Sequence, residues 1–419
     1  MEQKDKALLV GVNIGGQRNF NQLIEELESL AIACNIEVVG RETQNLDIVN
    51  KPFYLGKGKL EEIKEIVVSQ DIDIVIFNNE LSHTQLRNLQ RILDCPILDR
   101  TSLILEIFST RAKTREAKLQ IEVAKLQYML PRLVGLHESL GRQGGGSGLS
   151  NKGSGEKKLE LDRRRIESKL TELKKELEEL SMDRNIQRKQ REESEIPLVS
   201  LVGYTNAGKS SFMNYMVDKF IKDDEKRVLE KDMLFATLET SVRKIELNDN
   251  RKLLLSDTVG FISELPHDLV KAFRSTLEEI KNADLLVEVI DYSNPNFAEH
   301  MAVTKETLEK LGASDIPIIH VFNKSELMLD KLPLVDENEI YLSIKEEKGL
   351  DELIDMIIDR IYKNYKLCKM LIPFDKGQIV NFLNENENVL NTEYTENGTL
   401  LEIECRDATY NKYEEYKVE

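Results

Sequence analysis

A glycine-rich stretch in the middle of the chain ends in a lysine and two serines. It reads GYTNAGKSS, runs from Gly203 to Ser211, follows the apolar run IPLVSLVG and precedes KSSFMNYMVDKF. A strand, a loop of spacing G-x-x-x-x-G-K-S and a helix form the context of a phosphate-binding loop, in which backbone N–H groups face the phosphates. We predict that Lys209 neutralises the β- and γ-phosphates and that the Ser210 hydroxyl binds magnesium. A glycine-bearing turn that contains a lysine is the alternative.

Two segments that follow this loop carry further groups for magnesium and phosphate. A strand in KLLLSDTVGFI ends at Asp257, whose carboxylate is placed to hold magnesium through water, and the Gly260 N–H can approach the γ-phosphate. In DMLFATLETSVRKIEL, Thr237 can reach magnesium and the γ-phosphate when its loop becomes ordered. The alternative for Asp257 is an ordinary strand-ending aspartate before a glycine turn.

Two later segments are suited to a purine base. The strand in IPIIHVFNKSE ends at Asn323 and Lys324, which in folds of this kind contact the purine edge and stack on its face. The loop in IYLSIKEEKGL places Ser343 and Ile344 after another strand, where backbone amides can face the base. Strands and helices alternate here, so residues 196–365 are predicted to form an α/β domain with a mostly parallel sheet.

The rest of the chain is predicted to form three further regions. Residues 1–100 alternate the strands KALLVGV and IDIVIFNN with amphipathic helices, which predicts an N-terminal α/β domain; Ser82 is a helix cap ahead of Gln85. Residues 101–195 are predicted to form a long antiparallel helical hairpin. Residues 366–419 fit a strand, a helix and two strands, a small C-terminal α+β domain.

Apolar residues in the hairpin recur in steps of four and three. The first helix, predicted over about residues 101–133, is ended or kinked by Pro131, and the second is predicted over about residues 156–192. Between them, residues 141–155 are glycine-rich and are expected to be mobile. Basic residues at this tip suit a phosphate backbone, although a plain spacer is the alternative. The expected RNA contacts are Arg142, Lys152, Lys157, Lys158, Arg163, Arg164 and Arg165.

Composition and charge narrow the class of protein. The net charge is −17, yet residues 111–165 hold 13 Lys and Arg against 6 Asp and Glu, so one basic region stands in an acidic chain. The N-terminal segment lacks a signal-peptide core, and no apolar run reaches membrane-spanning length. We expect a cytoplasmic monomer without stable membrane insertion. The four dispersed cysteines are expected to be ordinary thiols.

Several of these motifs together resemble one family. LVGYTNAGKSS, FATLET, DTVGFI, LDRTSLILEIFSTRAKTREAKLQIEVAKLQYMLPRL and GEKKLELDRRRI are similar to segments of the HflX ribosome-associated GTPases, within the translation-factor-related P-loop class. The resemblance covers almost all of residues 6–365. It implies a switch GTPase that converts GTP to GDP and phosphate. It also implies binding to the large ribosomal subunit and the splitting of stalled or idle ribosomes, as in a stress response.

The resemblance also implies a set of site residues. Lys209, Thr237 and Gly260 are implied to be catalytic, and Ser210, Thr237 and, through water, Asp257 to hold Mg²⁺. The nucleotide-binding positions implied are Gly203, Tyr204, Thr205, Asn206, Ala207, Gly208, Lys209, Ser210, Ser211, Phe235, Ala236, Thr237, Leu238, Glu239, Asp257, Thr258, Val259, Gly260, Asn323, Lys324, Ser325, Glu326, Ser343, Ile344 and Lys345.

Three positions qualify the implied function. Glu326 stands where the guanine motif Asn-Lys-x-Asp has aspartate; it keeps the charge but is one methylene longer. Phe261 stands where many GTPases have a water-orienting glutamine, so intrinsic hydrolysis is expected to be slow and stimulated by ribosomes. Asn206 resembles the asparagine of potassium-dependent relatives, which adds K⁺ to Mg²⁺ as an expected cofactor; a turn-forming asparagine is the alternative.

Two other functions remain open on the sequence. One is a ribosome- or RNA-binding module whose nucleotide site is regulatory and barely catalytic, which Phe261 favours. The other is a purine NTPase of relaxed specificity, suggested by Glu326.

Overall fold

A computed structural model describes most of the 419-residue chain. The described residues are 4–17, 19–142, 152–193, 196–221, 234–235, 240–247, 251–264, 279–363 and 365–418, with side chains described except at 133–142, 152–159, 181–193 and 408. The chain divides into two compact units. The first consists of Met1–Arg188, Asp232–Leu238 and Ile262–Ser275, and the second of Lys189–Lys231, Glu239–Phe261 and Thr276–Glu419.

The first unit begins with a four-stranded parallel sheet of order β2-β1-β3-β4, which confirms the predicted N-terminal α/β fold. The central strand β1 buries Ala7 to Val10 completely, as expected for a strand covered on both faces. Ser82 and Gln85 form the predicted capping box of α3. The bounds are β1 Lys6–Ile14, α1 Phe20–Ala33, β2 Glu37–Leu46, α2 Lys57–Ser69, β3 Ile74–Phe77, α3 His83–Leu93 and β4 Ile97–Asp99.

Three helices follow, α4 (Arg100–Arg111), α5 (Arg115–Arg142) and α6 (Lys152–Glu193). The prediction of one helix over about residues 101–133 was therefore wrong. Ala112 is extended, with φ −63° and ψ 116°, and the Thr114 hydroxyl then accepts a hydrogen bond from the Ala117 N–H (3.2 Å), which caps a new helix. Of the two predicted effects of Pro131, an end or a kink of the first helix, the end is contradicted, since α5 continues through the proline. A proline removes only one hydrogen bond of the 28-residue helix.

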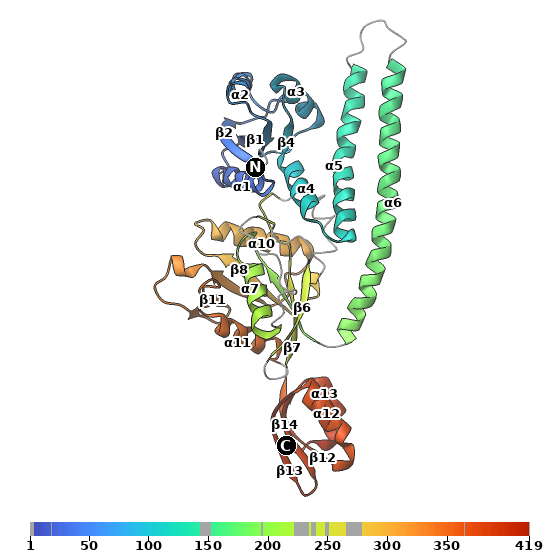
Figure 1. Cartoon of the computed structure of the whole chain (residues 1–419), viewed down its shortest axis with the longest axis vertical. Helices are drawn as coiled ribbons and strands as arrows, with labels where there is room; N and C mark the ends of the chain where they lie inside the picture. Colours follow the sequence, from blue (N-terminus) through green and yellow to red (C-terminus); the bar gives the residue numbers. More distant parts are fainter. Residues whose placement is uncertain are drawn as a thin grey trace. The chain divides into compact units, whose positions relative to one another are not determined.

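Helices α5 and α6 run side by side and are called the arm below (Figure 1). They share one apolar cluster whose members recur in steps of three and four along each helix. The cluster buries Leu119, Val123, Leu170 and Leu173, and Leu126, Leu130, Ile166, Leu177 and Leu180 pack against it.

The second unit contains a seven-stranded sheet of order β10-β11-β9-β8-β5-β7-β6. The edge strands β6 and β10 are antiparallel to their neighbours and the other pairs are parallel. Successive residues of β5 enter different apolar clusters, as a strand covered on both faces requires. The bounds are β5 Leu198–Val202, α7 Lys209–Met216, β6 Ser241–Glu246, β7 Lys252–Asp257, β8 Leu285–Asp291, α10 Phe297–Leu311, β9 Ile318–Asn323, β10 Leu334–Val335, β11 Glu339–Tyr341 and α11 Leu350–Ile361.

The C-terminal segment has its own antiparallel sheet, of order β12-β14-β13. Its strand, helix and two strands follow the predicted order, and a further helix, α13 (Asp407–Lys412), closes the segment. Met370, Leu383, Leu401 and Ile403 form the centre of its core. The bounds are β12 Lys366–Ile372, α12 Gly377–Asn386, β13 Asn388–Thr395 and β14 Gly398–Cys405. No helix in the described part of the chain is long and apolar enough to cross a membrane.

Candidate nucleotide site

The loop between β5 and α7 depends on its two glycines. Gly203 and Gly208 have φ angles of +128° and +112°, which residues with a side chain rarely adopt. A Cβ atom at Gly203 would lie 2.3 Å from the Val289 carbonyl oxygen, and one at Gly208 would lie 2.3 Å from Asn323 Nδ2. Each glycine therefore lets the loop pass close to another strand of the same sheet.

Lys209 begins α7 and is buried, with only 6% of its surface exposed. Its Nζ donates hydrogen bonds to the carbonyl oxygens of Gly203 (3.0 Å) and Tyr204 (2.6 Å), so the loop curls around the ammonium group. Burial lowers the pKa of Lys209 to about 8, and the charge of Asp257 acts in the opposite direction. An anion at the loop would restore the charged form.

The Asp257 carboxylate lies at the end of β7, beside the loop. Ser210 Oγ donates a hydrogen bond of 2.8 Å to Asp257 Oδ2, which brings a hydroxyl and a carboxylate oxygen together. Oxygen donors of this kind are what Mg²⁺ prefers, and the ion usually keeps several waters and takes phosphate oxygens as its other ligands. The described residues contain no group of three or more His, Cys, Asp or Glu side chains placed for a metal. A hydroxyl–carboxylate pair therefore fits Mg²⁺ bound together with a phosphate ligand.

Gly260 and Phe261 pair with the phosphate-binding loop. The Phe261 N–H donates to the Gly203 carbonyl (3.2 Å), and the Thr205 N–H donates to the Phe261 carbonyl (2.9 Å). A Cβ atom at Gly260 would lie 2.7 Å from Thr205 Cα and 3.0 Å from Lys209 Nζ. The Phe261 side chain is buried in the apolar cluster that includes Leu198. The backbone here is therefore close to the Lys209 ammonium, while the Phe261 ring lies in the core.

Asn323, at the end of β9, joins two loops. Its Nδ2 donates to the Ala207 carbonyl (2.8 Å), and its Oδ1 accepts from the Ile344 N–H (3.0 Å). Lys324 Nζ donates to Asp291 Oδ2 (2.7 Å) and to the Asn206 carbonyl (3.2 Å). The phosphate-binding loop, the end of β9 and the loop at residues 343–345 thus meet at one edge of the sheet.

Glu326 lies in a short 3-10 helix, Ser325–Leu327, directly after Lys324. Its Oε2 atom is buried and has no hydrogen-bond partner within the described ranges. A buried carboxylate oxygen is costly without a donor. The N–H groups on the guanine edge would supply such donors, so this oxygen suits the base predicted for the site. Ser325 instead donates its hydroxyl to the Phe322 carbonyl (2.7 Å) and supports the turn.

Thr258, another predicted position, is buried. Its hydroxyl donates a hydrogen bond to the Leu201 carbonyl (2.7 Å) and so joins two strands.

Some predicted positions cannot be placed in the site. The structure does not describe Ala236, Thr237, Leu238 and Glu239, and Phe235 belongs to the first unit. The side chains of Arg142, Lys152, Lys157 and Lys158 are also outside the described set. The remaining predicted RNA contacts, Arg163, Arg164 and Arg165, form ion pairs within α6 with Glu167, Glu160 and Asp162 respectively.

Two neighbours of the site were missed by the sequence analysis. The Tyr204 ring stacks on the His300 ring of α10, with centroids 3.7 Å apart and planes 5° apart. Asp291, at the end of β8, receives the Lys324 ammonium. Neither has a local signal: His300 lies within an ordinary amphipathic helix, and Asp291 lies 33 residues before its partner.

Three family models match successive parts of the chain. They are described as GTP-binding GTPase N-terminal (residues 21–109), GTP-binding GTPase Middle Region (residues 111–191) and 50S ribosome-binding GTPase (residues 198–324). A solved structure, described as a GTP-binding protein from the hyperthermophilic archaeon Sulfolobus solfataricus in complex with GDP, aligns at 25% identity and a TM-score of 0.45. It covers 85% of this chain and 99% of that one.

Curated relatives match along nearly the whole length. The GTPase HflX of Caldanaerobacter subterraneus is 43% identical over 96% of this chain and 91% of its own. The GTPase HflX of Escherichia coli is 36% identical over 90% of this chain and 87% of its own. The chain therefore belongs to the HflX family of GTPases, enzymes that hydrolyse GTP.

Proposed function

We propose that this protein binds the large ribosomal subunit and couples GTP binding and hydrolysis to the dissociation or rescue of stalled or idle ribosomes. The match of residues 198–324 to the 50S ribosome-binding GTPase model supports the choice of partner. The observation that carries the nucleotide role is the 2.8 Å hydrogen bond between Ser210 and Asp257, beside the buried Lys209. It brings the first turn of α7 next to the end of β7.

In this proposal GTP binds to the loop that follows β5. The N–H groups of residues 203–210 wrap the phosphates, and Lys209 supplies a positive charge already stripped of water. Ser210, Thr237 and, through water, Asp257 would hold Mg²⁺, which neutralises charge on the phosphate oxygens when bound. The short distance between Gly260 and Lys209 supports a role for the Gly260 N–H in sensing whether a γ-phosphate is present.

Hydrolysis depends on positioning and charge stabilisation more than on covalent help from the protein. The Phe261 ring lies in the apolar core and cannot orient water. Intrinsic turnover is therefore slow, and the ribosome completes the site. Asn206, in the left-handed conformation at φ 63°, is the position where K⁺ would assist.

Recognition of guanine uses the other strand ends. Asn323 fixes the base loop through the Ile344 N–H, and Glu326 offers a buried carboxylate oxygen to the base. Lys324 is held by Asp291 beside the Asn206 carbonyl, where its stem can cover the base. The longer Glu326 side chain thus does the work of the usual aspartate.

The arm supplies the ribosomal contact. The side chains of Arg163, Arg164 and Arg165 are at least 46% exposed, and each forms an ion pair with an acid one turn away on α6. Exposed pairs of this kind are worth about 0–1 kcal/mol, so an RNA phosphate can replace the acid at little cost.

The test uses purified 70S ribosomes and sucrose-gradient profiles. Protein with a non-hydrolysable GTP analogue should convert 70S particles to subunits, whereas protein with GDP should not. The matched variant Lys209→Ala should be inactive. If 70S particles stay intact at every protein concentration that occupies them, the splitting function is wrong.

Two alternatives have specific support. The buried Phe261 ring favours a binding module whose site hardly turns over, and single-turnover hydrolysis with saturating large subunits distinguishes it. The extra methylene of Glu326, compared with the usual aspartate, favours the second alternative, a purine NTPase of relaxed specificity. Competition of fluorescent GDP with ATP and GTP tests this alternative. If Glu326 binds guanine, ATP should compete much more weakly than GTP, because each charged hydrogen bond that is lost costs about 1.5–3 kcal/mol.

A further inference from the structure

Helix α4 begins and ends with an arginine, and each arginine binds the backbone of a distant segment. Arg100, the first residue, is only 3% exposed. Its Nη2 donates to the Ser263 carbonyl (3.0 Å) and pairs with Glu26 Oε2 (2.8 Å), while Nη1 donates to Asn78 Oδ1 (3.1 Å). The guanidinium is thus held on several sides by groups of the first unit.

Arg111, the last residue of α4, binds a second segment. Its Nη1 donates to the carbonyl oxygens of Leu234 (2.7 Å) and Phe235. Phe108, one turn earlier, packs edge-on against the Phe235 ring, with centroids 4.7 Å apart and planes at 79°. Phe235 has φ 56°, a conformation that bulky residues rarely adopt. The two hydrogen bonds and the ring contact hold it there.

The two bound segments flank the residues that sense the nucleotide in the proposed function. Phe235 precedes Thr237 by two residues, and Ser263 follows Gly260 by three. Phe235 and Ser263 belong to the first unit, whereas Asp257–Phe261 belong to the second. Each sensing residue is therefore separated from a residue held by α4 by only two or three peptide units.

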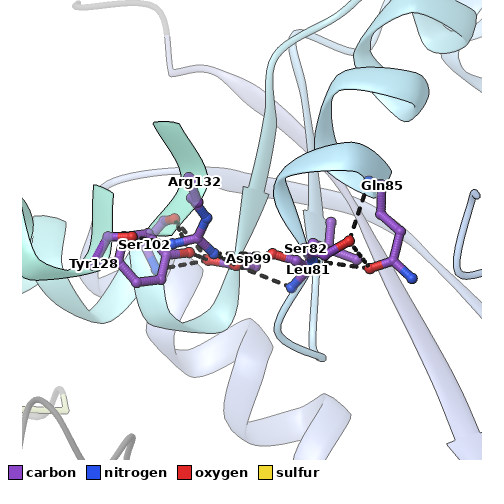
Figure 2. Close-up of polar contacts among 7 residues, drawn as sticks. All are labelled: Leu81, Ser82, Gln85, Asp99, Ser102, Tyr128 and Arg132. Carbon is purple, nitrogen blue, oxygen red and sulfur yellow. Dashed lines mark hydrogen bonds and ion pairs between the residues drawn. The ribbon is translucent and has the colours of Figure 1, made fainter. Parts of the chain in front are cut away.

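The start of α4 is also fixed to the arm (Figure 2). Asp99, which precedes Arg100, is fully buried and caps α4 by accepting from the Ser102 N–H (2.9 Å). The same carboxylate forms an ion pair with Arg132 of α5 (2.6 Å) and accepts a hydrogen bond from the Tyr128 hydroxyl of α5. The Arg132 guanidinium lies 3.2 Å from the centre of the Tyr128 ring. A displacement of α5 must therefore act on the first turn of α4.

We propose that Arg100 and Arg111 are positioning residues through which contact of the arm with the ribosome sets the conformations of the two nucleotide-sensing segments. This inference rests on the proposed function for the identity of the partner. Its physical basis is the twelve-residue helix α4. Asp99, at the start of α4, is bound to Arg132 of the arm. Arg100 binds the segment at Ser263, and Arg111 binds the segment at Phe235. A coupling of this kind is reciprocal, so nucleotide must also alter the arm end of α4.

The first experiment needs no ribosome. Amide hydrogen exchange is compared for protein with GDP and with a non-hydrolysable GTP analogue. The α4 and α5 amides near Ser102 and Tyr128 should differ between the two nucleotides in the wild type. In Arg111→Ala the difference should become smaller, because only the Arg100 link to Ser263 remains, while the control Arg41→Ala, which breaks a surface pair with Glu28, should keep the full difference. Identical exchange in the wild type with both nucleotides, or a difference of full size in Arg111→Ala, would overturn the proposal.

The second experiment measures GTP turnover with and without large subunits. Arg111→Ala should lower the stimulation factor at least about fivefold, with basal turnover, GDP affinity and subunit binding unchanged within about twofold. Arg111→Lys, which keeps a donor, should recover part of the stimulation. Arg100→Lys serves in place of Arg100→Ala, because removal of the buried positive charge would break the buried ion pair with Glu26. Full stimulation in both Arg111→Ala and Arg100→Lys would refute the proposal, whereas absence of stimulation in the wild type would count against the proposed function instead.

Discussion

The Lys209 ammonium is a buried charge whose neutral form is accessible near physiological pH. Burial lowers its pKa to about 8, and phosphates would favour the charged form. The free protein therefore loses this charge as pH rises through about 8, while the complex keeps it. We expect GDP affinity to be nearly constant below about pH 7 and to fall about fourfold between pH 7 and pH 8.5. Titration with fluorescent GDP checks this, and an affinity that stays constant to pH 8.5 would contradict it.

Gly260 has no room for a side chain. An added Cβ atom would meet Thr205 Cα at 2.7 Å and Lys209 Nζ at 3.0 Å. Gly260→Ala should displace the backbone by a fraction of an ångström or more and lower GTP turnover about 100-fold. GDP, which lacks the γ-phosphate, should bind with unchanged affinity. Steady-state turnover and GDP titration measure the two effects; equal losses of GDP affinity and turnover would show that the residue only supports the loop.

At the scale of elements, the sequence predicted a helix, strand or loop well where residues close together in the sequence determine it. The cap at Ser82 and Gln85 and the strand, loop and helix at Gly203 to Lys209 each depend on residues close in sequence. The edge strand β2 was not predicted, because its residues alternate between exposed and partly exposed positions and few of them are apolar. The three-residue β4 is too short to show a period.

Contacts between remote residues had no signal. Arg100 meets Ser263 across 163 residues, and Arg111 meets Phe235 across 124. The break between α4 and α5 depends on the Thr114 cap, which looks like any helical threonine in the sequence. The helical character of residues 100–111 was therefore predictable from the sequence, while the contacts of this helix with Ser263 and Phe235 were not.

A partly buried pair, His320 of β9 and Glu288 of β8, should make the stability of the sheet sensitive to pH. His320 Nδ1 lies 2.8 Å from Glu288 Oε2, and this hydrogen bond raises the pKa of His320. The pKa of His320 is higher in the folded protein than in the unfolded chain. The stabilisation of the folded state by the His320–Glu288 pair is therefore complete below about pH 6.5 and is lost as pH rises through the folded pKa. Glu288→Gln keeps the shape but should remove that pH dependence and about 1.5–3 kcal/mol at low pH.

The local free energy of opening in β8 and β9, from amide exchange at several pH values, measures this effect. A mild surface control is Lys310→Ala on α10, which breaks an exposed pair with Glu306 and should leave the profile unchanged. The same pH profile in wild type and Glu288→Gln would show that the pair does not contribute.

At the scale of the whole molecule, charge is distributed unevenly along the chain. The chain has net charge −17, but the region that includes the arm's first helix and the triplet Arg163–Arg165 is basic. Charge reversal of the triplet should weaken binding to large subunits and reduce the slope of log affinity against log salt by up to about 2–3. Reversal of Lys305 and Lys310 on α10 is the control. Sedimentation at several salt concentrations measures both, and an unchanged slope would make the arm a spacer.

In the proposed function, Lys209, Asp257 and Asn323 bind one GTP, and the ribosome stimulates its hydrolysis. GTP turnover should be measured with and without purified large subunits, at fixed potassium and salt. We expect slow turnover by the protein alone, at least about tenfold faster turnover with subunits, and none by Lys209→Ala under either condition. Turnover that is the same with and without subunits, or that persists in Lys209→Ala, would show that the proposed function is wrong.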